Sequence, residues 1–485
     1  MGATTMTATR LPLYRNAIDF DALYAEYPLP DTWYDTVFKW PAERVRELQN
    51  RRFLETVAAG WKNGFYAPRW RAAGLEPGDI KSLDDIVKLP VFTSDDIKDD
   101  QRDHAPFGLI PGIEREDLGR VPIKVQTSGG TTGKPRAMVH TPREWEVLSI
   151  TTARCIWVQG ARPGDVMQVP VTCATAMLGW GFYKACHDFL GILPLTTGSG
   201  VVTPSRRQIE MAFDFGTNIW ISFPEYLARL AQAAKEELGR DVRDLHTKFL
   251  TSFLGPDTEG TLRRGLEAMW GCPVYDNYGI NEIGGGAFEG PDKDGLYFME
   301  DCSYFEILDT ETGKQVPTGE VGNMVVTCFY RETAPIIRYN LRDLTRILPA
   351  KASALGSHFR RMDHFLGRSD DMVKIRGVNI YPMACLSAVR SDPRTTGEWV
   401  CIVDRVARDA SPRDEMTVLV ELRSDAGGVE GLKQHLEDRL KSDLGLSVAV
   451  DLVETGNLEK IANMGVGEGK ARRLVDRRPR YEKKR

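Results

Sequence analysis

The chain contains Thr127-Ser128-Gly129-Gly130-Thr131-Thr132-Gly133-Lys134-Pro135, which brings three glycines, four hydroxyl side chains and one lysine into nine residues. Glycines let the backbone turn sharply and present its N–H groups, and such a concavity suits the oxygens of a polyphosphate. The apolar-alternating run 121–125 precedes it and predicts a strand. A Walker A loop is excluded, because only three residues separate Gly129 from Gly133 and a proline follows the lysine. A Gly/Thr-rich surface turn is the alternative interpretation.

The overall composition indicates a globular protein of more than one domain, since 485 residues with 42% hydrophobic and 27% charged content are ordinary for that class. The net charge of -5 gives no overall attraction to nucleic acid or to an anionic membrane, so we expect neither partner. Eight cysteines without a Cys-x-x-Cys pair predict reduced, mostly buried thiols in a cytoplasmic protein. No apolar run reaches the ~18 residues of a membrane-spanning helix, and the N-terminus lacks a signal-peptide core.

The segments around the loop predict its surroundings. Residues 1 to about 85 are expected to be helical, with their many aromatic side chains in core packing. After the loop, Thr141-Pro142-Arg143-Glu144 is a capping-box pattern with proline at the first helical position, and it predicts a helix to about Val158. The loop would then lie between a strand and a helix start, a kind of site that favours anions.

Strands and helices alternate further along the chain. Residues 166–171 and 219–222 predict buried strands, and Ser222-Phe223-Pro224-Glu225 predicts a second capping box for a helix that Gly239 closes. This alternation predicts α/β layering with a largely parallel sheet. From Tyr297 onward, short strands separated by turn residues predict an antiparallel section that closes the large domain.

The chain turns polar near residues 367–371, and we place a domain boundary there. Residues 1–368 are predicted to form a large N-terminal α/β domain with layered sheets, and residues 369–485 a small α+β domain. The smaller domain is predicted to have strands near 372–380, 399–406, 416–423 and 448–453, and a helix that ends at Gly445. The basic residues in 472–485 indicate a solvated end, with nucleic-acid binding as the alternative.

Four further motifs follow the loop in order: Tyr278-Gly279-Ile280-Asn281-Glu282, then Arg338 to Asp343, then Gly367 to Pro382, then Gly467-Glu468-Gly469-Lys470. Together with the loop they resemble the adenylate-forming enzymes, the superfamily of acyl- and aryl-CoA ligases, and most of all its phenylacetate–CoA ligase branch. The resemblance covers about residues 89 to 475. It implies the adenylate-forming enzyme fold, in which the small C-terminal domain is mobile.

The resemblance also implies a reaction in two steps. A carboxylate attacks the α-phosphate of ATP, which releases pyrophosphate and leaves an acyl-adenylate, and the thiol of CoA then displaces AMP. The implied cofactors are ATP, Mg²⁺ and CoA, and the implied partner is a small-molecule aryl acid. A homodimer is one of the oligomeric states left open. The implied catalytic residues are Lys470, Glu282 and Thr131. The implied ATP-binding residues are Ser128, Gly129, Gly130, Thr131, Thr132, Gly133, Lys134, Asn277, Tyr278, Gly279, Asp343 and Arg368.

The chemistry of these residue types fits the implied roles. Glu282 would bind Mg²⁺, which needs only one or two carboxylates beside water and phosphate oxygens. Asp343 would accept charge-assisted hydrogen bonds from the ribose hydroxyls, although by spacing alone it could merely pair with Arg342 or Arg346. The alternative for Glu282 is an exposed carboxylate near a glycine-rich turn.

The C-terminal motifs carry the moving parts that the resemblance implies. Lys470 would stabilise the charge that develops between the carboxylate and the α-phosphate, but this chain lacks the family's usual proline just before it, and Lys460 is a less favoured substitute. Asp370 would be the hinge. The residues implied to line a tunnel for CoA are Lys374, Arg376 and Gly377.

The acid pocket is predicted from the aromatic segments between the motifs. Its predicted residues are Met177, Trp180, Tyr183, His187, Phe223 and Tyr275. Their aromatic character favours an aryl or arylalkanoic acid, while the alternative is that most of them pack in the core. Some relatives carry Cys and His after the Glu282 motif; residues 288–298 of this chain do not, so we predict no zinc.

Three functions follow from these patterns. The first is an aryl acid–CoA ligase. The second is an adenylating enzyme that passes the activated group to a carrier protein or an amine, or that activates an oxyanion other than a carboxylate. The third is a non-catalytic protein that binds nucleotide or uses its basic tail to bind nucleic acid.

Overall fold

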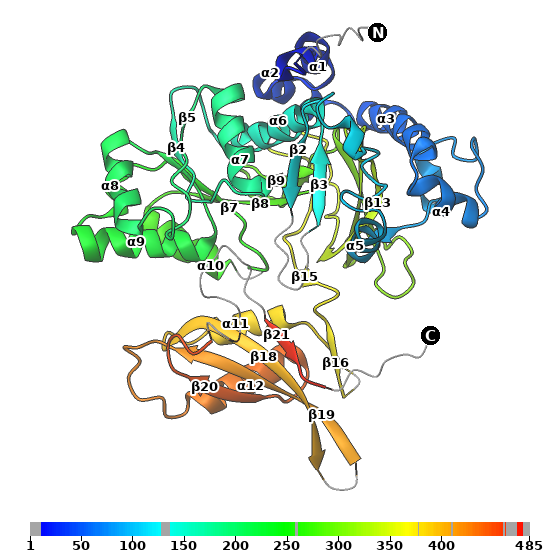
Figure 1. The fold of residues 1–485 in the computed structure, drawn as a ribbon. Coiled ribbons are helices and arrows are strands. Elements are labelled where there is room, and N and C mark those ends of the chain that lie inside the picture. The colour runs from blue at the N-terminus through cyan, green and yellow to red at the C-terminus, as the bar shows by residue number, and fades with distance from the viewer. Residues whose placement is uncertain are drawn as a thin grey trace, which may run out of the picture. The chain divides into compact units, whose positions relative to one another are not determined.

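In the computed structural model the chain forms two compact units, and the structure describes residues 11–127, 136–257, 260–376, 378–408, 411–458, 461 and 473–478. The first unit comprises Met1–Leu254, Thr261–Leu341 and Thr345–His364, and the second comprises Gly255–Gly260, Arg342–Leu344 and Phe365–Arg485. The predicted fold, a large α/β part with a smaller α+β part, is confirmed (Figure 1). None of the described helices combines the length and the apolar character needed to cross a bilayer.

The N-terminal part of the first unit is helical, as predicted. Its helices are η1 (Tyr14–Asn16), α1 (Phe20–Glu26), α2 (Pro30–Asp35), η2 (Val37–Lys39), α3 (Ala42–Lys62), α4 (Tyr66–Ala72) and η3 (Leu83–Lys88). Trp33 and Phe53 are completely buried, and Trp70 meets the ring of Trp61 edge-on with their centroids 5.0 Å apart. The predicted role of these aromatic residues in core packing is therefore confirmed.

A two-stranded hairpin and a long buried helix follow. Strand β1 (Phe92–Thr93) and helices α5 (Ser94–Asp103) and η4 (Arg115–Asp117) lead to the antiparallel pair β2 (Lys124–Thr127) and β3 (Ala137–His140). Helix α6 (Pro142–Val158) has the predicted capping box: the Glu144 N–H donates to the Thr141 hydroxyl, and the Thr141 N–H donates to the Glu144 carboxylate. In Figure 1 α6 lies between α2 and α7, and it also contacts both.

The largest sheet has eight strands in the order β14-β10-β9-β8-β7-β6-β4-β5. The parallel strands are β4 (Val166–Gln168), β5 (Leu193–Leu195), β6 (Ile219–Ile221), β7 (Phe249–Ser252) and β8 (Val274–Ile280), as predicted. The strands β9 (Gly284–Glu289), β10 (Leu296–Phe298) and β14 (Arg361–Met362) continue the sheet in antiparallel fashion. The connecting helices are α7 (Met177–Lys184), η5 (Ala185–Leu190), α8 (Ser205–Phe215), α9 (Pro224–Leu238), η6 (Val242–Leu245) and α10 (Thr261–Trp270).

The start of α9 differs from the prediction. Its N-cap is Phe223 and not Ser222, and no side chain caps the helix. Pro224 therefore occupies the first helical position, where its missing N–H leaves no hydrogen bond unmade. The predicted end is confirmed, since Gly239 closes α9 with a φ of 61°.

A second sheet completes the first unit with the predicted antiparallel strands. They are β11 (Ser303–Leu308), β12 (Gly322–Cys328) and β13 (Ile336–Thr345), and the short β1 joins β13 in parallel. The pairing of β1 was not predicted, because two residues carry no readable alternation.

The second unit has a four-stranded sheet in the order β20-β19-β18-β21. The strands of this sheet are β18 (Thr395–Arg408), β19 (Ser411–Leu422), β20 (Ala449–Val453) and β21 (Leu474–Asp476). The unit also contains the separate hairpin of β16 (Val373–Ile375) and β17 (Val378–Ile380), and the short β15 (Gly367–Arg368), which pairs with β13. Its helices are η7 (Pro382–Cys385), α11 (Leu386–Arg390) and α12 (Leu432–Leu444), and Gly445 ends α12 as predicted.

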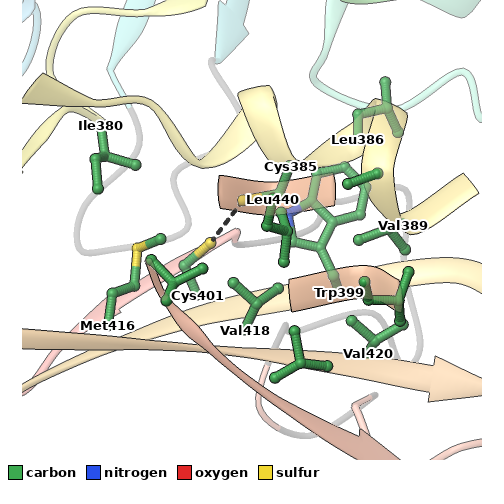
Figure 2. Close-up of a cluster of buried hydrophobic side chains, with 14 of the residues drawn as sticks. Ile380, Cys385, Leu386, Val389, Trp399, Cys401, Met416, Val418, Val420 and Leu440 are labelled. Carbon is green, nitrogen blue, oxygen red and sulfur yellow. Dashed lines mark hydrogen bonds between the residues drawn. The ribbon is translucent and has the colours of Figure 1, made fainter. Parts of the chain in front are cut away.

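The core of the second unit gathers apolar side chains around Trp399 (Figure 2). The Sγ atoms of Cys385 and Cys401 lie 3.7 Å apart in this core. The contact with Cys401 and burial raise the pKa of the Cys385 thiol well above its usual range, so the pair packs as inert apolar groups. All eight cysteines are free, and only Cys173 is not buried, which confirms the prediction of reduced, mostly buried thiols.

Candidate active site

The glycine- and threonine-rich loop joins the two strands of the β2–β3 hairpin. Its residues 128–135 lie outside the described residues, so the implied contacts of Ser128, Gly129, Gly130, Thr131, Thr132, Gly133 and Lys134 stay predictions. Thr127 before the loop pairs with Ala137 after it. The helix starts at Pro142 as predicted, but the expectation that the loop lies between a strand and that helix start is wrong, because β3 intervenes. The loop's predicted phosphate role therefore depends on the glycine- and threonine-rich sequence and Lys134, and not on a helix N-terminus directly after the loop.

Three predicted segments meet at the base of this loop. The Thr127 N–H donates to the Thr175 carbonyl at 2.9 Å. The Asn281 side chain donates to the Thr127 carbonyl at 3.0 Å and accepts from the Met177 N–H at 3.1 Å. One amide thus joins the strand before the loop, the first residue of α7 and the Tyr278–Glu282 motif. No role for Asn281 is predicted from the sequence, where only its place beside Glu282 could have indicated one.

Glu282 is buried beside an arginine. The side chain of Glu282 is 3% exposed, and its Oε1 accepts from Arg136 Nη2 at 3.1 Å and from the Tyr339 hydroxyl at 3.3 Å. Arg136 directly follows the loop, so the loop's end and this carboxylate are neighbours. A buried carboxylate can serve as the one protein ligand that Mg²⁺ takes beside phosphate oxygens and water, but Arg136 balances its charge when no metal is bound. The sequence analysis did not assign Arg136.

The described residues contain no group of three or more His, Cys, Asp and Glu side chains that could hold a metal ion. A metal held wholly by protein side chains, such as a structural zinc, therefore has no candidate among those residues. The predicted lack of zinc in the whole chain stays a prediction. A Mg²⁺ ion that takes Glu282 and completes its shell with water and phosphate is a different kind of site.

The predicted adenine contacts lie on β8. The Asn277 amide is engaged within the sheet, where it donates to the Thr251 hydroxyl at 2.7 Å and accepts from Gln159 at 2.9 Å. These bonds hold Asn277 within the sheet, and its adenine contact stays a prediction. A side chain at Gly279 would place its Cβ 2.7 Å from a carbonyl oxygen of the paired strand, so only glycine fits there. Tyr278 between them is 7% exposed.

The predicted ribose and hinge residues of the second unit share one arginine. Arg368 donates to Asp343 at 2.7 Å and forms a bidentate pair with Asp370 at 2.8 Å for both bonds. Asp343 and Arg368 are also register partners in the β13–β15 pair. Burial lowers the pKa of Arg368, but the hydrogen bond to Asp370 and the charge of Asp343 raise it more, so its net pKa is raised.

Four predicted acid-pocket residues form one stripe along α7 and η5: Met177, Trp180, Tyr183 and His187. The rings of Trp180 and Tyr183 meet edge-on with centroids 6.3 Å apart, and Tyr183 stacks on His187 at 5.5 Å. The stripe runs from buried Met177 to exposed His187, whose Nδ1 lies 2.6 Å from Asp188. Spacings of three and four residues on a helix explain why the four residues share a face.

The other two predicted pocket residues have different neighbours. Phe223 caps α9 and meets Phe253 at a centroid distance of 6.1 Å. Tyr275 is buried in the hydrophobic cluster beneath α7, where it packs on Phe249 at 5.6 Å. The alternative that some predicted pocket aromatics belong to the core therefore describes Tyr275.

The predicted CoA residues lie on the β16–β17 hairpin. Lys374 is exposed on β16, and its carbonyl accepts from Arg478 at 3.1 Å. Arg376 at the turn has a φ of 49° and donates to the Ser447 carbonyl at 2.7 Å. Gly377, Lys460 and Lys470 lie outside the described residues, and their roles stay predictions.

Comparison with known proteins assigns both parts of the chain. The family model "AMP-binding enzyme" matches residues 90–327, and the family model "AMP-binding enzyme C-terminal domain" matches residues 377–478. The chain is 32% identical to the phenylacetate-coenzyme A ligase of Aromatoleum evansii, over 92% of this chain and 97% of that protein. It is 31% identical to the enzyme of the same name from Pseudomonas putida, over 90% and 95% of the two chains.

A solved structure agrees with these relatives. The crystal structure of a 2-hydroxyisobutyryl-CoA ligase in the postadenylation state, in complex with 2-HIB-AMP, matches with a TM-score of 0.79 and 26% identity over 90% of each chain. An anthranilate CoA ligase with bound anthranoyl-AMP matches at 18% identity and a TM-score of 0.51, over 68% of this chain and 63% of that one, which shows the fold alone. The chain belongs to the adenylate-forming AMP-binding enzymes, in their phenylacetate–CoA ligase branch, and is an AMP-forming acid–CoA ligase that uses ATP and CoA on a small-molecule acid.

Proposed function

We propose that this enzyme activates an aryl or arylalkanoic carboxylic acid with ATP to an acyl-adenylate, and then transfers the acyl group to CoA. The observation that carries the proposal is the junction at Asn281, which ties the base of the phosphate loop, helix α7 and the Glu282 motif together. The junction supports the proposal because Thr127, Met177 and Asn281 are each next to or within a segment predicted to bind phosphate, acid or metal. The names of the curated relatives support an aryl acid as substrate.

The adenylation half would use charge stabilisation at the phosphates. Residues 128–134 would hold the β- and γ-phosphates through backbone N–H groups, with Thr131 and Lys134 as side-chain donors. Glu282 would hold Mg²⁺, which when bound neutralises phosphate charge. Asp343 would accept hydrogen bonds from the ribose hydroxyls, and its neighbour Arg368 would reach toward the α-phosphate.

The acid's carboxylate oxygen would then attack the α-phosphorus as pyrophosphate leaves. Negative charge builds up on the α-phosphate oxygens in that transition state, and Lys470 would stabilise it. The acyl-adenylate has AMP as its leaving group, so a thiolate can displace it in the second step. Asn277, which hydrogen bonds within the sheet hold in place, would contact the adenine together with Tyr278 and Gly279.

The thioester half would use the smaller domain. We propose that the functional domains divide at residue 368, so that 1–368 binds ATP and acid and 369–485 carries the moving parts. Asp370 would be the hinge, and its bidentate pair with Arg368 would have to rearrange when the domain turns. Lys374, Arg376 and Gly377 would then line the path of the CoA arm.

The acid pocket would be formed along the α7 stripe. Trp180 and Tyr183 offer ring surfaces suited to an aromatic acid, and Phe223 would close the pocket from α9. We still expect a cytoplasmic location and neither a nucleic-acid nor a membrane partner. Whether the protein forms a homodimer is left open.

The test is acid-dependent exchange of labelled pyrophosphate into ATP, measured with a panel of aryl and alkyl acids and followed by AMP release with and without CoA. We expect exchange with at least one aryl acid and AMP release that increases when CoA is added. Exchange without any CoA effect would favour the carrier-protein or amine acceptor. No exchange with any acid would refute the proposal.

A further inference from the structure

The buried face of the β2–β3 hairpin carries polar atoms that bond to nothing in the described part of the protein. Lys124 and Gln126 alternate onto this face of β2, and their register partners His140 and Met138 share it on β3. Gln126 and His140 are completely buried. Within the described residues, both amide atoms of Gln126 and the Nε2 atom of His140 have no hydrogen-bond partner. Buried polar atoms of this kind are normally satisfied, by protein, water or ligand.

His140 presents a donor on this face. The Arg331 guanidinium can only donate, so the hydrogen bond between them makes Nδ1 of His140 the acceptor. Burial and the charges of Arg331 and Lys124 lower the pKa of His140 well below its usual range, which keeps the ring neutral. A neutral imidazole that accepts at Nδ1 carries its proton on Nε2. The unbonded Nε2 atom is therefore an N–H donor.

Lys124 adds a cation between two indole rings. Its Nζ lies 4.7 Å from the ring centroid of Trp145 and 4.9 Å from that of Trp180. Among the described residues no carboxylate forms an ion pair with Lys124, whereas the neighbouring Lys184 is held by two. The rings of Trp145 and His140 are 6.3 Å apart, so the lysine, the histidine and the indoles form one cluster.

This cluster lies next to the proposed acid pocket. Trp180 belongs to the α7 stripe, and α7 begins at the Asn281 junction beneath the phosphate loop. Lys124 lies three positions before Thr127 at the base of the loop, which is about 10 Å along a strand. An acid whose carboxylate lies at the loop would thus direct the far end of its ring toward the cluster.

We propose that Lys124, Gln126 and His140 form a subsite that binds a hydroxyl group on the aromatic ring of the acid, so that the substrate class is the ring-hydroxylated aryl acids. The inference rests on the proposed function. An ammonium, an imidazole N–H and an amide NH₂ are the available donors, of which the hydroxyl oxygen can accept two, and the amide oxygen of Gln126 can accept a hydrogen bond from the hydroxyl. The indole of Trp180 would cover the ring. A ring without the hydroxyl would leave these buried groups without hydrogen bonds, which lowers kcat/KM for that acid strongly.

The test compares hydroxyphenylacetates, with the hydroxyl at each ring position, against phenylacetate in acid-dependent pyrophosphate exchange. We expect at least one hydroxylated acid to exceed phenylacetate in kcat/KM by about 10- to 100-fold. Gln126→Met and Lys124→Met should each reduce that ratio at least about tenfold. Lys124→Arg should retain part of the preference. Lys235→Met, at an exposed position of α9, is the matched control and should leave the ratio unchanged.

Acid binding in the absence of ATP gives a second measurement, by quenching of tryptophan fluorescence. Gln126→Met should weaken binding of the preferred hydroxylated acid and not that of phenylacetate, which a general loss of folding cannot produce. A wild-type preference for phenylacetate, or variants that lower all acids equally, would overturn the subsite while leaving the proposed function in place. Unchanged ratios would show that water alone satisfies these atoms, and would overturn it too. The proposed function itself fails only if no acid supports exchange.

Discussion

Replacement of Arg136 by Met would test whether Glu282 is built to hold a cation. The two side chains are 3.1 Å apart, with 18% and 3% of their surfaces exposed. Without the guanidinium, the Glu282 carboxylate stays buried with the Tyr339 hydroxyl at 3.3 Å as its recorded donor. Breaking a fully buried ion pair costs about 3–5 kcal/mol, and the partial exposure of Arg136 lets water recover some of this. We therefore expect Arg136→Met to lower the free energy of unfolding of the first unit by about 2–4 kcal/mol.

A double-mutant cycle isolates the pair. Glu282→Gln in the Arg136→Met background replaces the unpaired charge by a neutral amide, so much of the lost stability should return, with a coupling of about 2 kcal/mol. Urea unfolding followed by tryptophan fluorescence is the assay, because Trp399 is the only one of the ten tryptophans in the second unit. Arg346→Met is the matched control, since its pair with Asp363 is more exposed and contributes at most about 1 kcal/mol.

Mg²⁺ without nucleotide supplies an independent measurement. In the wild-type protein Arg136 already neutralises Glu282, so Mg²⁺ should leave the unfolding midpoint unchanged. In Arg136→Met the unpaired carboxylate is available, so Mg²⁺ should raise the midpoint, and the added Glu282→Gln substitution should abolish that rise. A coupling below about 0.5 kcal/mol, together with no effect of Mg²⁺ on Arg136→Met, would refute both the neutralising role of Arg136 and the metal site at Glu282.

Three further predictions concern other parts of the enzyme. Lys470→Ala should lower the adenylation rate by about 10²–10³-fold in pyrophosphate exchange, as for loss of one transition-state donor, with little effect on thioester formation from supplied acyl-adenylate; equal losses in both steps would contradict its role. Asp343→Ala should raise the KM for ATP much more than it lowers kcat, and an unchanged KM would count against the ribose contact. The third concerns His364, whose pKa burial lowers but the hydrogen bond and charge of Asp276 at 2.9 Å raise more. Its folded-state pKa therefore exceeds the usual 6.5, so the pair stabilises the protein fully below about pH 6.5 and loses this contribution as the pH rises through the raised value. The difference in unfolding free energy between wild type and Asp276→Asn should accordingly shrink from pH 6 to pH 9, and a constant difference would contradict the linkage.

Features that depend on neighbouring residues were predictable from the sequence. The capping box at Thr141 needs only four consecutive residues, and the end of α9 needs only a glycine that tolerates a positive φ. The parallel strands were also predictable, because strands covered on both faces are short apolar runs between helices. The exact helix start was less predictable, because the N-cap of α9 is Phe223, one residue after the predicted Ser222.

Features that depend on distant residues were not predictable. Strand β3 is too short for its alternation to be recognised, and only its pairing with β2 defines it. Asn281 became a functional candidate only when the structure placed its amide between Thr127 and Met177, which are 50 residues apart in the sequence. Arg136 likewise gained a role only from its contact with Glu282. In each case the residue type alone predicts no role, and the role follows only from the residue that its side chain contacts.

The residues proposed to select the acid lie outside the sequence motifs. The motifs carry the residues proposed to act on ATP, and these determine the reaction that all members of the family share. Lys124 and Gln126 lie just before the phosphate loop, on a face that strand alternation orients toward α6 and α7. Substitutions there can change which ring the enzyme accepts without disturbing a phosphate contact, because alternate residues of a strand point to opposite faces. A family with one shared reaction can therefore diversify its acids at positions that no motif includes, and this chain's polar cluster is one such position.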